Sequence, residues 1–207
     1  MIEKIYIASP FFNKFEVKVR DNMEKKVRET FPSFEIIRPD LSENSEGYAM
    51  AGPEDRFEKA KLVYSDNIND IESASILVFP RWTEDLGTNF EVGYASSCFI
   101  RTSKVPNKKI YRYDYLSDSL TEVNKNDIVR MAEAVRDLSY DVNFSDYVIK
   151  LKSPAHVVLF GVLAGLGLDP VYEIEGGADN LMLAAKFRTR ITKVVSPSER
   201  SWLGGIL

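Results

Sequence analysis

Apolar runs and segments with helical periodicity alternate along the first half of the chain. Short apolar runs typical of buried strands occupy residues 4–8, 34–37, 76–79 and 109–113. Apolar residues with helical spacing predict helices over 15–30, 54–73 and 88–99. In the first of these helices, Val19, Met23 and Val27 lie four apart on one face. This alternation predicts an α/β fold with a parallel sheet, whose carboxyl edge would bind ligands.

The alternation is interrupted in two places. The polar stretch 41–53 contains two glycines and predicts a loop. The region 116–169 predicts a helical insertion. The remaining elements are predicted as helices over 126–138 and 154–166, a strand at 171–174 and a helix over 180–191. We find no internal repeat or linker, so we expect a single domain over residues 1–207.

Composition narrows the possible chemistry. The 207 residues are 44% hydrophobic, enough for a core, and 27 basic against 31 acidic residues give a net charge of −4, which argues against nucleic-acid binding. One cysteine and one histidine exclude an internal disulfide and a multi-histidine or cysteine zinc site. No Gly-x-Gly-x-x-Gly or Walker loop occurs, so we expect neither a metal nor a cofactor. Chemistry would therefore depend on carboxylates, amides and hydroxyls.

The sequence pattern indicates neither a signal peptide nor a membrane-spanning segment. The first residues lack the basic and apolar regions of a signal peptide. The most apolar stretch, 157–168, is too short to span a bilayer. We therefore expect a cytoplasmic protein with no membrane partner.

The segment Asp85-Leu-Gly-Thr-Asn-Phe-Glu91-Val-Gly-Tyr-Ala95 follows an apolar strand and opens a predicted helix. One interpretation is structural: Thr88 and Glu91 have the spacing of a capping box, and Gly87 would form the tight turn. The other is catalytic. Glu91 would be an ionised carboxylate at the mouth of the sheet, suited to attack on an anomeric carbon, and Asp85 would hold a sugar hydroxyl.

Four segments together carry a resemblance to a known family. They are Lys4-Ile-Tyr6-Ile-Ala-Ser9-Pro10-Phe11-Phe12, Tyr64-Ser-Asp66-Asn67-Ile-Asn-Asp70-Ile71, the segment from Asp85 to Ala95, and Asp179-Asn180-Leu181-Met182-Leu183. With this order and spacing, the chain resembles the nucleoside 2-deoxyribosyltransferase family over roughly the first 113 residues and the stretch after Asp179. The fold that we expect is therefore a Rossmann-like (flavodoxin-like) parallel sheet flanked by helices, with the helical insertion.

The resemblance implies a role for each matching residue. Glu91 matches the nucleophile that attacks C1′ of a 2′-deoxynucleoside and forms a covalent deoxyribosyl-enzyme, which a second base then attacks. Tyr6 matches the tyrosine that orients this glutamate, and Asp85 the aspartate that binds deoxyribose hydroxyls. Asn180 and Met182 match a segment that reaches the site of a neighbouring subunit. The resemblance thus implies a homo-oligomer with shared active sites that acts on deoxynucleosides and nucleobases.

One position departs from the family's pattern. Asn67 falls where many members have an aspartate that contacts the base, and an amide cannot protonate a leaving base. Three alternatives follow: Asn67 serves at this position, the adjacent Asp66 serves instead, or the leaving base is protonated by other means.

Aromatic and single reactive residues are weaker candidates. Phe11 and Phe12 are expected to stack on a base or to join the core, and Trp82 to cover the pocket or to pack on the surface. Gly87 and Thr88 are expected to bind the substrate. His156 and Cys98 are expected to be structural.

Three functions remain open from the sequence. The first is base exchange on 2′-deoxynucleosides, a pentosyl transfer that makes the protein a glycosyltransferase. The second is hydrolysis of 2′-deoxynucleoside 5′-monophosphates, although the loop of residues 9–15 has no Arg or Gly for a phosphate and Lys14 is its only basic residue. The third is a non-catalytic nucleotide-binding domain.

Overall fold

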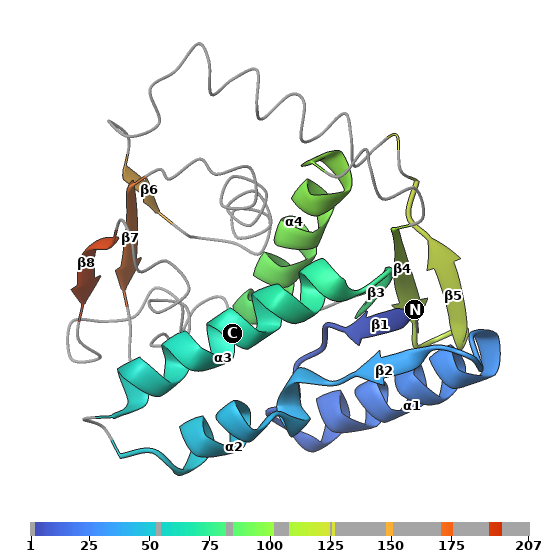
Figure 1. Ribbon diagram of the computed structural model, residues 1–207, viewed down its shortest axis with the longest axis horizontal. Coiled ribbons are helices and arrows are strands. Elements are labelled where there is room, and N and C mark those ends of the chain that lie inside the picture. The colour runs from blue at the N-terminus through green and yellow to red at the C-terminus, as the bar shows by residue number, and fades with distance from the viewer. Residues whose placement is uncertain are drawn as a thin grey trace.

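A five-stranded sheet forms the centre of the computed structural model (Figure 1). The structure describes residues 3–52, 55–81, 85–101, 108–124, 126, 148–150, 171–175 and 191–195. The sheet has the order β2-β1-β3-β4-β5. Its strands are β1 (Lys4–Ile7), β2 (Glu35–Ile37), β3 (Ile76–Pro80), β4 (Lys109–Asp114) and β5 (Ser119–Glu122). The first four are parallel, and β5 pairs antiparallel to β4, so the predicted α/β class is confirmed.

Helices cover both faces of this sheet. They are α1 (Lys14–Thr30), α2 (Glu43–Met50), α3 (Arg56–Ser73) and α4 (Leu86–Arg101), with a short 3-10 helix η1 (Pro39–Leu41). On one face, Ile5 and Ile7 of β1 pack with the buried stripe of α1. On the other, Tyr6 packs with residues of α3 and α4 such as Ile71 and Phe90. The alternation of neighbouring side chains along β1 thus separates the two cores.

The predicted helix and strand boundaries agree closely with the structure in this part of the chain. Helix α1 begins after Asn13, whose side chain accepts hydrogen bonds from the Phe15 and Glu16 amides, while the Glu16 side chain accepts one from the Asn13 amide. This capping box and the buried stripe of Val19, Met23 and Val27 explain why the helix was predictable. Cys98 is buried in the core, as predicted.

Two predictions for the segments beside the five-stranded sheet are wrong. Residues 43–50, predicted as a loop, form α2, which Ser42 caps by accepting from the Ser45 amide and which packs on α3. This helix has no buried residues and therefore no apolar stripe to detect. Residues 119–122, placed in the helical insertion, form the edge strand β5. The turn before β5 places Asp118 at a φ of 47°, where it accepts a hydrogen bond from the Tyr113 hydroxyl.

The later part of the chain contains a second sheet. It is three-stranded and parallel, with the order β6 (Val148–Lys150), β7 (Val171–Glu175) and β8 (Ile191–Val195) (Figure 1). The predicted strand at 171–174 is confirmed, whereas Ile191, predicted as the end of a helix, begins β8. Of the helix predicted over 126–138, residue 126 is helical and the rest lies outside the described residues, as do residues 180–190 and the predicted helix at 154–166.

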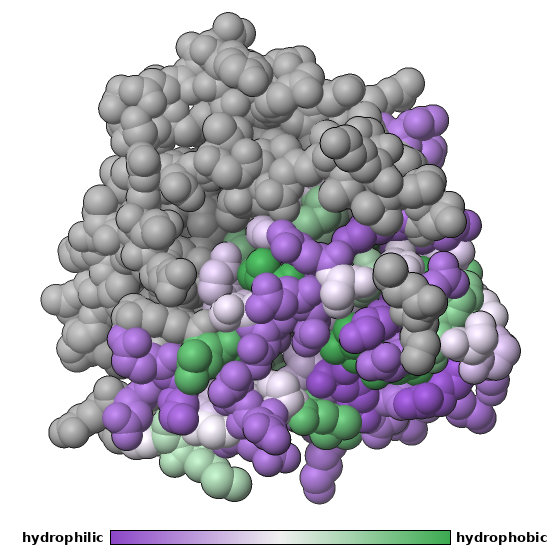
Figure 2. Space-filling model, in the orientation of Figure 1, coloured by the Kyte–Doolittle hydropathy of each residue, from purple (hydrophilic) through white to green (hydrophobic). Residues whose placement is uncertain are grey.

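The visible surface of the described part is mainly hydrophilic, with hydrophobic residues in small separate groups (Figure 2). None of the helices in the described segments combines the length and the apolar character needed to cross a membrane.

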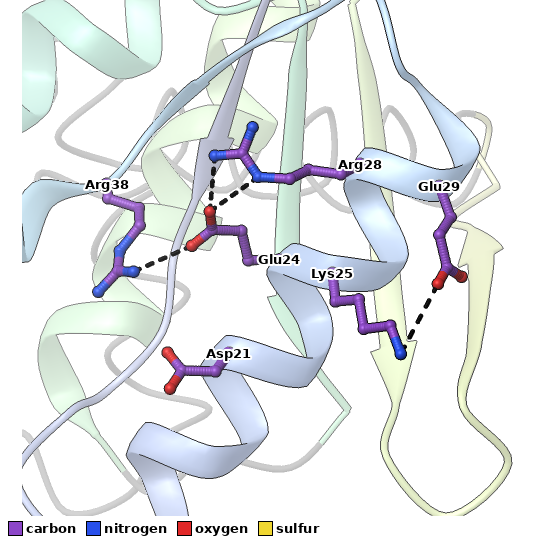
Figure 3. Close-up of a pocket in the computed structure, with 6 residues that line it drawn as sticks. All are labelled: Asp21, Glu24, Lys25, Arg28, Glu29 and Arg38. Carbon is purple, nitrogen blue, oxygen red and sulfur yellow. Dashed lines mark hydrogen bonds and ion pairs between the residues drawn. The ribbon is translucent and has the colours of Figure 1, made fainter.

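A shallow hollow of about 560 Å³ lies over α1 and the end of β2 (Figure 3). It is lined only by charged residues, three acidic and three basic: Asp21, Glu24, Glu29, Lys25, Arg28 and Arg38. Glu24 accepts hydrogen bonds from both Arg28 and Arg38, and Lys25 lies 4.0 Å from Glu29. Because its charges balance and pair with one another, the hollow has no excess charge to attract an ionic ligand.

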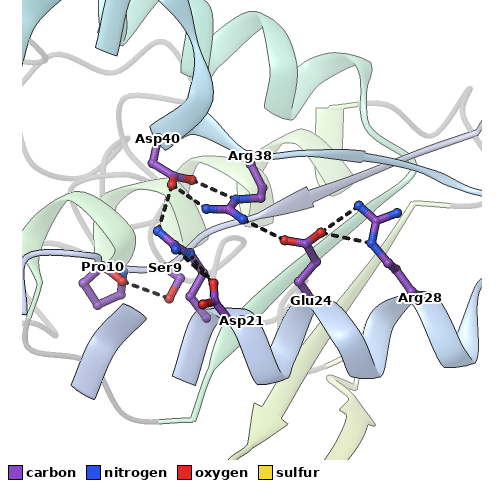
Figure 4. A network of polar contacts seen from close by, with 8 residues as sticks. Ser9, Pro10, Asp21, Glu24, Arg28, Arg38 and Asp40 are labelled. Atoms are coloured by element: carbon purple, nitrogen blue, oxygen red, sulfur yellow. Dashed lines mark hydrogen bonds and ion pairs between the residues drawn. The ribbon is translucent and has the colours of Figure 1, made fainter. Parts of the chain in front are cut away.

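A network of ion pairs joins this hollow to the end of β2 (Figure 4). Asp40 has a side chain only 9% exposed and accepts from Arg20 at 2.7 Å and from Arg38 at 2.6 Å. Arg20, itself 11% exposed at its side chain, also pairs with Asp21 at 2.9 Å. The network therefore fixes the chain after β2 against α1.

Removal of Asp40 should destabilise the fold strongly. In Asp40→Ala, two largely buried guanidinium groups lose a shared carboxylate, which should lower the free energy of unfolding by about 3 kcal/mol or more. Glu29→Ala breaks only exposed pairs of α1 and should cost less than about 1 kcal/mol. Urea unfolding of both variants tests this, and equal costs would show that Asp40 does not anchor the segment.

Candidate functional site

The site lies at the carboxyl edge of the sheet, where β1 and β3 are neighbours. From β1 the chain continues to β2 on one side, whereas β3 and β4 lie on the other side. Connections from β1 and β3 therefore diverge at this point, which is where open α/β sheets commonly bind ligands. The strand-to-helix connection after β3 leads into α4, and α4 carries Glu91.

Glu91 is buried together with an amide from another helix. Its residue is 6% exposed, and Asn67 of α3 is 5% exposed. The Asn67 Nδ2 donates a hydrogen bond to Glu91 Oε1 at 2.9 Å. A carboxylate is costly to bury without such donors, and a hydrogen bond to a charged acceptor is stronger than one between neutral groups. The hydrogen bond from Asn67 thus replaces one of the hydrogen bonds to water that the Glu91 carboxylate loses on burial.

The other end of the same amide has no partner. Asn67 Oδ1 is buried and makes no hydrogen bond to any described residue. Exchange of the amide oxygen and nitrogen would bring Oδ1 against the Glu91 carboxylate and turn an attraction into a repulsion. The contact with Glu91 therefore fixes the orientation of the amide, and Oδ1 is left able to accept a hydrogen bond.

Tyr6 of β1 is the third polar group of the cluster. It is fully buried, and its hydroxyl makes no hydrogen bond of normal geometry to a described residue. Burial raises the pKa of Tyr6 well above its ordinary value, and the nearby negative charge of Glu91 raises it further. The hydroxyl therefore keeps its proton beside the carboxylate. Smaller contributions to this raised pKa come from the charges of Asp70 and Asp40.

Helix α4 begins earlier than the capping-box interpretation predicted. Its first residue is Leu86, and the Asp85 carboxylate accepts a hydrogen bond from the Thr88 amide at 2.5 Å. Asp85, rather than Thr88, is therefore the residue that caps the helix, and Thr88 is buried inside its first turn. The structural interpretation of Thr88 and Glu91 as a capping box is wrong, and Gly87 also lies within the helix.

Asp66 and Asn67 face different neighbours. Asn44 of α2 donates to the Asp66 Oδ2 at 2.7 Å, while Asn67 reaches Glu91. Consecutive residues of a helix point about 100° apart, so only one of the two could face α4. Of the alternatives left open by the sequence, the structure brings Asn67 to Glu91. Which of them contacts a base is not decided by this contact.

The aromatic residues after β1 stack on each other. The ring centroids of Phe11 and Phe12 are 5.1 Å apart with an interplanar angle of 26°, and the residues are 40% and 73% exposed. They therefore do not belong to the core, which was one of the two expectations. Three other candidates, Trp82, Asn180 and Met182, lie outside the described residues, as does His156.

Two acidic residues that sequence reasoning did not single out, Asp40 and Asp70, act on Tyr6 electrostatically. Asp70 lies within the segment from Tyr64 to Ile71 but was given no role there. The available signal for Asp40 was its position three residues after the strand at 34–37, because residues there lie near the carboxyl edge. No group of three His, Cys, Asp or Glu side chains within the described segments is arranged to hold a metal ion.

In comparisons with protein-family models and with curated proteins, nothing matched this chain.

The Tyr6 hydroxyl should contribute little to stability at neutral pH. Tyr6→Phe keeps the buried ring and removes a hydroxyl without a hydrogen-bond partner among the described residues, so the free energy of unfolding should change by less than about 1 kcal/mol. Tyr6→Ala should lower it by about 3–5 kcal/mol, because it leaves a cavity.

The same variant should alter stability at alkaline pH. The raised pKa keeps Tyr6 protonated in the folded state while the unfolded chain releases this proton near pH 10, so wild-type stability falls above about pH 10. Tyr6→Phe should lose less stability than the wild type as the pH rises from about 9.5 to about 11 in chemical denaturation. Parallel losses in both proteins would contradict the burial of a neutral hydroxyl here.

Proposed function

We propose that the protein is a nucleoside 2-deoxyribosyltransferase that exchanges nucleobases on 2′-deoxynucleosides. The observation that carries this proposal is the buried Glu91 carboxylate, held by Asn67 at 2.9 Å beside Tyr6 at the carboxyl edge of β1 and β3. The strand order supports a Rossmann-like (flavodoxin-like) fold, with β1 and β3 at the switch point.

Two displacements at the same carbon account for the exchange. In the first, a Glu91 oxygen forms a bond to C1′ of the deoxyribose, and the C1′–N bond breaks with its electron pair leaving on the base. In the second, a nitrogen of an incoming base attacks C1′ from the opposite side and returns the carboxylate to Glu91. Each step inverts C1′, so the product keeps the configuration of the substrate.

The surrounding residues have distinct roles in this proposal. Tyr6 remains protonated beside Glu91 and would orient this carboxylate, as the resemblance implies. Asp85 binds a sugar hydroxyl in addition to capping α4, and Gly87 and Thr88 line the same turn. Phe11 and Phe12 offer exposed ring faces on which a base can stack.

Because residue 67 is an asparagine and not an aspartate, this site has one carboxylate beside Tyr6 where many members of the resembling family have two. An asparagine accepts or donates hydrogen bonds but supplies no proton to a leaving base. The buried Oδ1 is a suitable acceptor for an N–H of the base, and the proton on the leaving base comes from another source, such as solvent. Bases that leave readily without protonation are therefore the favoured substrates.

The oligomer is part of the proposal. Asn180 and Met182 would complete the site of a neighbouring subunit in a closed homo-oligomer, as the resemblance implies. We also propose a cytoplasmic location, where deoxynucleosides and free bases meet.

Replacement of Glu91 is the direct test of the chemistry. Glu91→Gln retains a carbonyl oxygen for Asn67 but is a poor nucleophile, so base exchange should fall by at least about a thousandfold while the fold persists. Glu29→Gln, on the exposed side of α1, is the matched control and should remain active. A 2-fluoro-2-deoxynucleoside should label Glu91, detected by peptide mass spectrometry.

The assay also separates the competing functions. Deoxyinosine is incubated with adenine or cytosine, deoxynucleoside monophosphates are incubated in parallel, and products are followed by chromatography. New nucleoside should form faster than free deoxyribose. Release of sugar phosphate alone would support the hydrolase instead, and binding without turnover would support a non-catalytic domain.

Subunit mixing tests the shared site. Glu91→Gln and Asn180→Ala chains should each be nearly inactive, and their co-assembly should restore part of the activity, because some sites then combine both wild-type residues. For two damaged chains in a symmetric dimer, about one quarter of the sites would be complete after random mixing. No recovery, or a strictly monomeric protein, would show that one chain builds the site.

A further inference from the structure

We propose that Asn67 is a positioning residue for Glu91, one whose amide nitrogen holds the carboxylate in place while its amide oxygen accepts a hydrogen bond from the bound ligand. The inference rests on the proposed role of Glu91 as the nucleophile and adds a role for Asn67 beyond base contact. It is carried by two observations on one buried side chain: the Nδ2 bond to Glu91 Oε1 at 2.9 Å and the unpartnered Oδ1.

The first observation concerns the nucleophile. Helices α3 and α4 meet at Asn67 and Glu91, which are both at least nine-tenths buried. Because Nδ2 can only donate, it favours the charged carboxylate over the protonated acid at Oε1. The bond also fixes the plane of the carboxylate, which a nucleophile must direct at one carbon atom.

The second observation concerns the ligand. A buried amide oxygen without a partner has lost its hydrogen bonds to water and gained none in the described part of the protein. A ligand with an N–H or O–H donor would satisfy Oδ1 and thereby immobilise the whole amide. Since the amide is rigid, that contact would further restrict Nδ2 and therefore Glu91. Ligand binding and alignment of the nucleophile are coupled through this one side chain.

An aspartate at this position would behave differently. Its carboxylate oxygen would take the place of Nδ2, about 2.9 Å from Glu91 Oε1. Two carboxylates at this distance in a buried site do not both ionise, so the pair retains a proton. Among the described residues, Tyr6 of β1 lies close enough to Glu91 to feel its charge, and the charges of Asp70 of α3 and Asp40 of η1 also act on Tyr6. The acidic ones only strengthen the retention of that proton.

The test compares two aspartate variants of the same helix. Asn67→Asp places the new carboxylate against Glu91, whereas Asn69→Asp adds the same charge two residues away at an exposed position of α3. The carboxyl carbons of glutamate are labelled with ¹³C, and the signal missing from Glu91→Gln identifies Glu91. Its titration is then followed by NMR, which needs no substrate.

The expected result is a shift in one variant only. The midpoint of the Glu91 titration should rise by about one pH unit or more in Asn67→Asp and change little in Asn69→Asp. Asn67→Ala, which removes the donor without adding charge, should also raise the midpoint. If Asn67→Asp does not fold, Asn67→Ala carries the test alone. An unchanged midpoint in the Asn67 variants that fold would overturn the proposal.

Stability provides a second readout without substrate. The folded Asn67→Asp protein holds a proton that the unfolded chain releases near its ordinary value. The stability of this variant relative to Asn69→Asp should therefore fall as the pH rises from about 4 to about 8. A pH-independent difference would contradict a shared proton at positions 67 and 91.

Kinetics distinguish positioning from base contact. If Asn67 positions Glu91, Asn67→Ala should lower kcat and move the acidic limb of the pH–rate profile upward; a residue that only binds the base would raise KM and leave that limb unchanged. If the wild type shows no base exchange, the proposed function fails, whereas the NMR titration still decides whether Asn67 controls the ionisation of Glu91.

Discussion

The hydrogen bond from Asn67 Nδ2 to Glu91 Oε1 is the interaction on which the candidate site depends. It joins α3 to α4, two helices that pack on the same face of the sheet. A buried carboxylate without donors would take up a proton or draw in water, and either would change its chemistry. With the amide in place, the buried Glu91 carboxyl group accepts a hydrogen bond at Oε1, close enough to Tyr6 to raise the pKa of that hydroxyl.

A second group of buried charged residues, after the end of β2, is stabilised in a different way. Asp40 is surrounded by Arg20 and Arg38, so its charge is neutralised by two cations. The hydrogen bond that Glu91 accepts from Asn67 comes instead from a neutral amide. The first arrangement is suited to holding a chain segment still. The second is compatible with the function proposed above, in which the Glu91 carboxylate reacts with an electrophile.

Sequence reasoning succeeded where one element determines its own structure. The buried residues of α1 form an apolar stripe with helical spacing, and β3 is an uninterrupted apolar run, so both elements can be recognised from their own residues. Their boundaries were predicted to within about two residues. Helix α2 was missed because it has no buried residue and depends on α3 for support. Strand β5 was missed because its four polar and apolar residues form a sheet edge only through pairing with β4. Likewise, Thr88 and Glu91 have the spacing of a capping box, but the helix begins one turn earlier, and Asp85 caps it by accepting a hydrogen bond from the Thr88 amide.

By itself, the sequence determined the α/β class, which follows from local periodicity, and predicted a ligand site at the carboxyl edge of the sheet. The candidacy of Asp85 and Glu91 follows from a motif whose residues lie close together in the chain, whereas that of Tyr6 came from the resemblance. Only the tertiary structure decided that Asn67, and not Asp66, faces Glu91, and that the amide oxygen of Asn67 has no hydrogen-bond partner among the described residues. The reason is geometric. Adjacent residues on a helix point about 100° apart, and only the packing of α3 against α4 selects which of them meets a residue 24 positions away.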